Sequence, residues 1–284
     1  MKKLGVAISV YDKLDCVKTN INIIRNHWKS NKDSFVSVCC NDKDTLDQIS
    51  NMLEINSIVQ GDQISTSTKA ERRMRIFDCL RKSTLACQSE YIIHYHADAF
   101  ALSEKPILEL INHMEENNYN VAFRGKGLEY RNPKTFAGDV DDHFLIFKRS
   151  EILNRSLFKI SNEEAKRILT VGNVETLLSI LIQEAFKKEE IFYYDDMRLN
   201  IVHENCIDKD GFYSDGISHR DMNPFNIDPN RSFYHIGDKN RMSEILLGAG
   251  IPKEMICVTS NVSKSTVYTK VSSEESHIEE WINE

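Results

Sequence analysis

Apolar runs alternate with helically periodic stretches along the first half of the chain. Residues 4–10 and 35–40 are near-continuous apolar runs, which is typical of strands buried on both faces of a sheet. Between them, residues 16–28 place apolar side chains every three or four positions, so these side chains share one face of a helix. The same patterns predict a helix at 44–53, a strand at 58–59, a helix from 68 to about 87, a strand at 91–95 and a helix at 104–117.

This order of elements predicts a fold class. Strand and helix alternate three times before the fourth strand, which favours a doubly wound, mostly parallel α/β sheet. In such a sheet, ligands bind beyond the carboxyl ends of the strands. The loops after Val10, Cys40 and Tyr95 are therefore expected at one shared edge.

Two of the predicted helices carry further detail. Thr68 and Glu71 have the spacing of a capping box, which predicts that the long helix begins there. Leu46, Ile49 and Leu53 are spaced to bury one face of helix 44–53.

The second half of the chain is less regular. Residues 173–187 are strongly amphipathic and predict a helix, and a shorter helix is predicted at 241–247. Residues 206–232 are rich in Asp, Asn, Gly and Pro, which predicts a long loop of the kind that is often functional. The predicted strands of this half are 121–123, 143–147 and 198–202.

Composition and charge narrow the class of protein. The 284 residues suit one large α/β domain, and the net charge of −7 argues against non-specific nucleic-acid binding, which needs a basic surface. Seven cysteines without a CxxC pair indicate buried thiols in a reducing cytosol rather than disulfides or a zinc site. No run approaches the roughly 18 apolar residues that a membrane span requires. A soluble, cytoplasmic protein is expected, and peripheral contact with a membrane stays open.

Candidate chemistry begins with His96, Ala97 and Asp98, which directly follow the predicted strand 91–95. An acidic residue at a strand end can hold Mg²⁺, which proteins bind through one or two carboxylates together with substrate phosphates. The histidine suits Mn²⁺ or softer metals better, or it hydrogen-bonds a ribose or phosphate oxygen. The alternative is a solvated acidic residue at a strand end that binds nothing.

Three segments in this order resemble the nucleotide half of GT-A fold glycosyltransferases, most closely the large family-2-type group. They are residues 7–11, the strand that ends at Asp42, and residues 91–98 with their DxD-like motif. The resemblance covers roughly residues 3–190. It implies an open GT-A sheet in one domain, with a nucleotide-sugar-binding half at 1–118 and an acceptor-binding half with a C-terminal lid at 119–284. The loop at 206–232 is the candidate lid.

The resemblance also implies roles for residues of the nucleotide half. Ser9, Val10 and Tyr11 would back the nucleobase, and Asp42 would recognise its edge. The motif would carry Mn²⁺ or Mg²⁺ and the donor diphosphate, with Asp98 and His96 as metal ligands and Ala97 beside them.

Basic residues on helix 68–87 are candidates for the donor diphosphate, because members of this group often bring such a residue to it. Arg72 and Arg73 lie near the helix N-terminus, which favours anions, so they rank above Arg75. A solvated basic helix face is the alternative.

The acceptor half offers rival candidates for a catalytic base. The resemblance implies an acidic pair at the start of helix 173–187, where only Glu175 is acidic. The alternative is that Glu175 stabilises the helix dipole. Asp139, Asp141 and Asp142 form a second acidic group before a predicted strand, and Asp139 or Asp142 would bind the acceptor or act as the base, unless the group is a solvated loop.

A late histidine completes the metal site in many GT-A enzymes. His203 follows the predicted strand 198–202, and His235 precedes a predicted helix. The order along the chain slightly favours His203, although a lone histidine is more often structural. Lys239 and Arg241, which follow His235, are further candidates for the diphosphate.

The resemblance thus implies a hexosyl- or pentosyltransferase that moves a sugar from a nucleotide-diphosphate donor to a hydroxyl of a glycan, polysaccharide or glycolipid acceptor. A non-catalytic sugar-nucleotide or glycan-binding protein stays open, because position 96 lacks a carboxylate and Glu175 stands alone. A sugar nucleotidyltransferase would carry a glycine-rich loop after the first strand, and a dinucleotide-dependent oxidoreductase would carry GxGxxG there. Neither pattern is present. The donor, the stereochemistry and the oligomeric state are left open.

Overall fold

The sheet at the centre of the molecule has seven strands in the order β3-β2-β1-β4-β7-β6-β8. In the computed structural model, the described residues are 2–125, 140–196, 233–235 and 242–258. All neighbouring strands run parallel except β7, which is antiparallel to both β4 and β6. The predicted open, mostly parallel α/β sheet is therefore confirmed. Its strands are β1 (Lys2–Val10), β2 (Phe35–Cys40), β3 (Ser57–Gln60), β4 (Ser89–His96), β6 (Val121–Gly125), β7 (Leu145–Lys148) and β8 (Ile191–Asp196).

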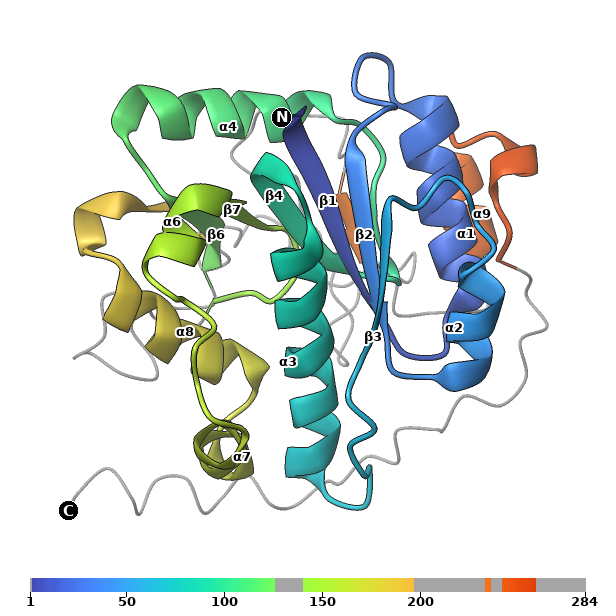
Figure 1. Cartoon of the computed structure of the whole chain (residues 1–284). Coiled ribbons are helices and arrows are strands. Elements are labelled where there is room, and N and C mark those ends of the chain that lie inside the picture. The colour runs from blue at the N-terminus through green and yellow to red at the C-terminus, as the bar shows by residue number, and fades with distance from the viewer. Residues whose placement is uncertain (1, 126–139, 197–232, 236–241, 259–284) are drawn as a thin grey trace, which may run out of the picture.

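Helices cover both faces of the sheet (Figure 1). One buried cluster joins the sheet to α1, α2, α4 and α9, and a second joins it to α3, α6, α7 and α8. None of the helices in the described ranges is long and apolar enough to cross a membrane. The helices are α1 (Leu14–Asn22), α2 (Lys43–Ile49), α3 (Lys69–Ala86), α4 (Lys105–Asn117), α6 (Arg149–Asn154), α7 (Asn162–Val171), α8 (Val174–Ala185) and α9 (Met242–Gly248).

Alternation along the strands divides their side chains between the two clusters. In β1, Leu4, Val6 and Ile8 pack toward α1 and α4, whereas Ala7 packs toward α3. Successive strand residues point to opposite faces, and both faces are covered, so the strand is apolar at nearly every position. This is why the sequence shows continuous apolar runs.

Helix boundaries follow the capping residues. Thr68 forms the predicted capping box with Glu71, and Asn173 caps α8. The prediction for helix 44–53 is wrong at its end, because α2 stops at Ile49 and the Leu53 side chain is 96% exposed. β8 and α7 were not predicted, and the predicted strand 198–202 and loop 206–232 lie outside the described residues.

The described cysteines are free thiols. Five of these six are buried and Cys257 is half-buried. Burial is the largest cause that raises the pKa of Cys40 to about 12, and the pKa of Cys87 is raised to about 12 for the same reason. These two thiols are protonated at neutral pH, which fits the predicted structural role.

Glu104 ties the start of α4 to the turn before β2, and its loss is expected to destabilise the fold. Its Oε1 accepts hydrogen bonds from the backbone N–H groups of Lys29 and Ser30 and from the Ser30 hydroxyl. Glu104→Ala leaves two backbone donors unpaired, which should cost about 2–4 kcal/mol in urea-unfolding free energy. Glu104→Gln keeps an acceptor oxygen and is the matched control. Its free energy of unfolding should fall by less than that of Glu104→Ala. An alanine variant as stable as wild type would contradict this role.

The contribution of Glu104 should also depend on pH. Burial alone would raise the pKa of Glu104, but hydrogen bonds from Ser30 and Lys29 outweigh it and lower the pKa. Because the folded pKa lies below the unfolded value, this stabilisation is present above the unfolded pKa, about 4.3. It is lost as the pH falls through the folded value, so the difference between wild type and Glu104→Gln should shrink in acid.

Candidate functional site

The carboxyl ends of β1, β2 and β4 meet at one edge of the sheet. Ser9 in β1 is the register partner of both Cys39 in β2 and His96 in β4. The three strands are parallel, so the loops that follow them leave the same edge. This placement confirms the shared edge that was predicted from the order of elements.

Ser9, Val10 and Ala97 hold this edge together through their own hydrogen bonds. The backbone N–H of Ala97 donates to the Ser9 carbonyl at 3.0 Å, and the Ala97 carbonyl accepts from Asn20 Nδ2 at 2.8 Å. The Val10 carbonyl accepts from the Asn41 N–H at 3.3 Å. The Ser9 hydroxyl lies 3.0 Å from His96 Nδ1 and orients that ring.

Arg75 on α3 reaches Tyr11 at the end of β1. Its guanidinium lies 4.3 Å from the centroid of the Tyr11 ring, and the Tyr11 side chain is 47% exposed. Arg75 Nε is buried and has no hydrogen-bond partner within the described residues. A partly buried guanidinium, with no ion pair to a carboxylate among the residues that the structure describes, therefore lies beside an accessible aromatic ring.

The other two arginines of α3 lie elsewhere. Arg72 is exposed and donates from Nη1 to the Thr66 carbonyl at 3.0 Å. Arg73 donates from Nη1 to the Leu169 carbonyl at the end of α7, also at 3.0 Å. Burial lowers the pKa of Arg73, and the nearby Glu175 carboxylate opposes that shift. Of the three, Arg75 is the one that contacts Tyr11.

Asp42 and Asp98 each have a partner within the protein. Asp42 caps α2, and its Oδ2 accepts from the Thr45 N–H at 2.8 Å. Asp98 forms a part-buried ion pair with Lys13, which stands just before α1. The acidic residue of the His-x-Asp motif is thus already paired with an ammonium group.

Asp142 and His143, from the segment before β7, lie next to His96. His96 Nε2 lies 3.3 Å from Asp142 Oδ2, and the rings of His96 and His143 have centroids 4.7 Å apart. His143 Nδ1 lies 3.0 Å from both Asp141 Oδ1 and Asp142 Oδ1. We call His96, Asp142 and His143 the His-Asp-His cluster.

Electrostatics within the cluster are strong because it is buried. Burial alone would raise the pKa of Asp142, but the imidazoles of His143 and His96 outweigh it and hold the pKa well below its usual value. Burial alone would lower the pKa of His143, whereas Asp142 and Asp141 together raise it to about 10. Beneath the cluster, burial and then the charge of His96 lower the pKa of His94 well below its usual value.

The backbone next to the cluster is strained. Phe144 follows His143 and has φ of 56°, a left-handed conformation that is uncommon for a bulky side chain. Its ring is buried beside Tyr95, and its carbonyl accepts from the Tyr194 hydroxyl at 2.7 Å. Such conformations persist where packing over-determines them and are frequent at functional sites.

Glu175 lies in the first turn of α8. Its side chain is 9% exposed, and it is close enough to Arg73 for the two charges to interact. Its carbonyl accepts from the Ser179 hydroxyl at 2.9 Å, and the Ser179 oxygen in turn accepts from the Val140 N–H at 3.1 Å. Ser179 in α8 therefore ties this helix to the segment that carries Asp142 and His143.

Several predicted site residues lie outside the described residues: Asp139, His203, Lys239 and Arg241. The backbone of His235 is described as part of β9 (Phe233–His235), which pairs with β5 (Ala99–Ala101) in a separate two-stranded sheet. His235 is the register partner of Ala99, the residue after Asp98. The backbone of His235 therefore lies beside the end of the His96–Asp98 motif.

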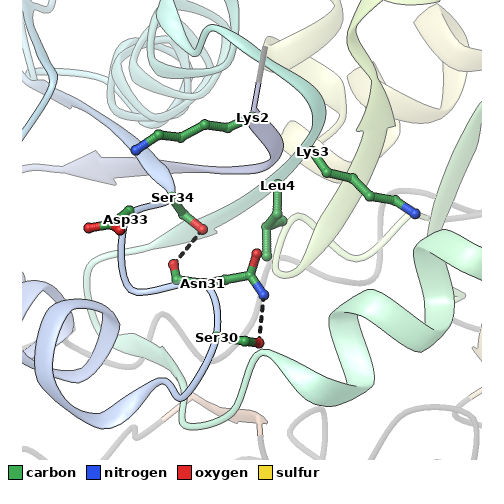
Figure 2. A pocket seen from close by; sticks show the side chains of 7 residues that line it. All are labelled: Lys2, Lys3, Leu4, Ser30, Asn31, Asp33 and Ser34. Atoms are coloured by element: carbon green, nitrogen blue, oxygen red, sulfur yellow. Dashed lines mark hydrogen bonds between the residues drawn. The ribbon is translucent and has the colours of Figure 1, made fainter.

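A shallow hollow of about 210 Å³ lies at the opposite ends of β1 and β2 (Figure 2). It is lined by Lys2, Lys3, Leu4 and the turn before β2, in which Asn31 bonds to Ser30 and Ser34. β1 begins at this hollow and ends at Val10, so the hollow is not part of the site.

Comparisons with known proteins find similarity in solved structures. No protein-family model and no curated protein matches the chain. The chain is similar to S. aureus TarS residues 1–349 with UDP-GlcNAc, at 12% identity and a TM-score of 0.39, over 64% of this chain and 53% of that one. The complex of the same residues with UDP has 12% identity and a TM-score of 0.36, over 60% of this chain and 54% of that one. A longer S. aureus TarS structure has 9% identity and a TM-score of 0.43, over 89% of this chain and 41% of that one. The chain spans about half the length of these structures.

Proposed function

We propose that this chain is a glycosyltransferase that moves a sugar from a nucleotide-diphosphate donor to a hydroxyl of a glycan, polysaccharide or glycolipid acceptor. The observation that carries the proposal is Arg75, a cation without a carboxylate partner in the described residues, stacked on the half-exposed Tyr11 at the carboxyl edge of the sheet. An anion that also carries an aromatic base satisfies both groups, and a nucleoside diphosphate is such a molecule.

The donor lies across the ends of β1, β2 and β4. The base stacks on Tyr11, and Asp42 stands at the neighbouring strand end, where it meets the base edge while it caps α2. Arg75 takes the diphosphate, a role for which the sequence favoured Arg72 and Arg73. Ser9, Val10 and Ala97 support the floor of this site through their backbone and hydroxyl bonds.

A divalent cation, Mn²⁺ or Mg²⁺, would neutralise the charge on the departing diphosphate. The resemblance implies His96 and Asp98 as its ligands, with His203 or His235 completing the set, but the Asp98 carboxylate is paired with Lys13. The pairing of His235 with Ala99 favours His235 of these two, because it brings that residue's backbone beside the motif.

Transfer requires a base for the acceptor. The acceptor oxygen forms a bond to the anomeric carbon, its proton passes to a carboxylate, and the bond from that carbon to the diphosphate oxygen breaks. We assign the base to Glu175, the acidic residue that the resemblance implies at the start of α8, a helix that Ser179 ties to Val140. Asp142 is less suited, because His96 and His143 hold its carboxylate. Asp139 stays a candidate.

A second candidate function is a binding protein for sugar nucleotides or glycans that performs no transfer. The observation that favours it is the Lys13–Asp98 ion pair, which occupies the only carboxylate of the motif. A sugar nucleotidyltransferase is less favoured, because Tyr11-Asp12-Lys13 follows β1 without a glycine. Turnover separates a transferase from a binder, since a binder releases no nucleotide.

Titration of the purified protein with UDP, GDP and dTDP tests the donor site. One of these should bind saturably, and Tyr11→Leu should weaken that binding about tenfold, because stacking on an aromatic ring contributes about 1–3 kcal/mol per base. Tyr11→Phe keeps the ring and should bind like wild type. Equal affinities for wild type and Tyr11→Leu, or no binding of any nucleotide, would remove the basis of the proposal.

A further inference from the structure

The His-Asp-His cluster brings together ligand atoms of a kind that binds transition metals. One ligand atom each from His96, Asp142 and His143 lies within 4.8 Å of the others. The cluster joins the end of β4 to the segment before β7, and the two segments are 46 residues apart in the chain. Two imidazole nitrogens and one carboxylate oxygen form a donor set that suits Mn²⁺, Co²⁺ or Zn²⁺ better than Mg²⁺.

Each imidazole of the cluster also contacts a polar group outside it. His96 Nδ1 lies 3.0 Å from the Ser9 hydroxyl, and His143 Nδ1 lies 3.0 Å from Asp141 Oδ1. Metal-binding histidines usually bond their second ring nitrogen to a carboxylate, carbonyl or similar group, which orients the ring and selects the tautomer. In His96 this leaves Nε2, which faces Asp142 Oδ2, to bind the metal. In His143 it is Nδ1 that faces Asp142 Oδ1, as well as Asp141 Oδ1.

The carboxylate of the cluster differs from the carboxylate of the motif. Asp98 is paired with Lys13, whereas Asp142 is surrounded by the two imidazoles. The Oδ1 atom of Asp142 is buried and lies 3.0 Å from His143 Nδ1. Of the two carboxylates, the one beside the imidazoles is therefore the better candidate to bind a metal that histidine also binds.

We propose that His96, Asp142 and His143 form a site for one transition-metal ion, with Ser9 and Asp141 orienting the two histidines. Asp98 is not a ligand of this ion, and its charge is balanced by Lys13. His96 side-chain exposure of 17% leaves a route by which an ion enters. The inference rests on the proposed function and revises its metal site, since Asp142 and His143 take the place of Asp98 beside His96. Metal binding is measured on the free protein without a nucleotide.

Visible absorption of added Co²⁺ tests the site in the full-length protein after treatment with a chelator. We expect one Co²⁺ per chain with ligand-field bands, competition by Zn²⁺ or Mn²⁺, and no displacement by an equal concentration of Mg²⁺. His143→Gln and Asp142→Asn should abolish the bands. Ser9→Ala should weaken binding about 10-fold to 100-fold, the usual effect of removing an orienting partner.

Asp98→Asn distinguishes this site from the ligand set that the resemblance implies, because it should bind Co²⁺ like wild type if Asp98 is not a ligand. Wild type without Co²⁺ bands, or bands that survive His143→Gln and vanish in Asp98→Asn, would overturn the proposal. Circular dichroism of each variant shows whether it is folded, and if His143→Gln unfolds, the comparison of Ser9→Ala with Asp98→Asn decides. Nucleotide binding in the presence of chelator is measured separately, so failure of the metal site is distinguishable from failure of the donor site.

Discussion

Glu175→Gln is expected to lower kcat by about 10²-fold to 10⁴-fold while leaving donor affinity unchanged, since a general base typically contributes a factor of this size. The amide keeps the shape of the side chain but cannot accept the acceptor's proton. Glu175 is nearly buried in the first turn of α8 and interacts electrostatically with Arg73. Steady-state kinetics with saturating donor and acceptor measure the change.

The matched control for this prediction lies on the same helix. Glu184 is exposed on α8, so Glu184→Gln removes the same charge without touching the site. It should retain the wild-type kcat. If Glu175→Gln and Glu184→Gln have the same kcat as wild type, the base is another residue, and Asp139 and Asp142 become the candidates to test next.

Arg75→Met is expected to weaken nucleoside-diphosphate binding about 10-fold to 100-fold. Hydrogen bonds to a charged group contribute about 1.5–3 kcal/mol, and each 1.4 kcal/mol corresponds to a factor of ten in affinity. Methionine keeps much of the length and apolar bulk of arginine next to Tyr11 and removes only the charge and the donors. Isothermal titration with the preferred nucleotide gives the two dissociation constants.

Arg72→Met provides the comparison, because Arg72 lies on the same helix but is exposed and bonds to the Thr66 carbonyl. It should bind the nucleotide almost as tightly as wild type. If Arg72→Met binds the nucleotide weakly and Arg75→Met binds it like wild type, Arg72 is the better candidate for the diphosphate, as the sequence favoured. That result would also show that the stack on Tyr11 has no part in donor binding.

Much of the fold could be predicted from the sequence, because both faces of the sheet are covered by helices. That coverage makes β2 and most of β1 near-continuously apolar, and the period changes sharply where a helix follows. Local signals also located helix starts such as Thr68. The end of α2 was missed because Leu53 continues the apolar period although its side chain is exposed. The antiparallel insertion of β7 between β4 and β6 depends on tertiary pairing, which periodicity does not report.

The candidate site was only partly predictable, because it too depends on tertiary contacts. The edge itself follows from strand order, and Ser9, Tyr11 and His96 do lie there. The choice among the arginines of α3 depends on the rotation of the helix against β1, which places Arg75 over Tyr11. His143 was missed as a partner of His96, because contacts between distant segments leave no periodic signal. The sequence Asp141-Asp142-His143 before a strand was the one local sign of it.

Release of free nucleotide from UDP-, GDP- and dTDP-sugars, with and without Mn²⁺ and with candidate acceptor sugars, tests the central claim most directly. A glycosyltransferase of the kind proposed here releases nucleotide from one donor class, faster with its acceptor and with metal, and Glu175→Gln loses that release. Saturable donor binding without release under any of these conditions would contradict transfer and identify the chain as a sugar-nucleotide-binding protein.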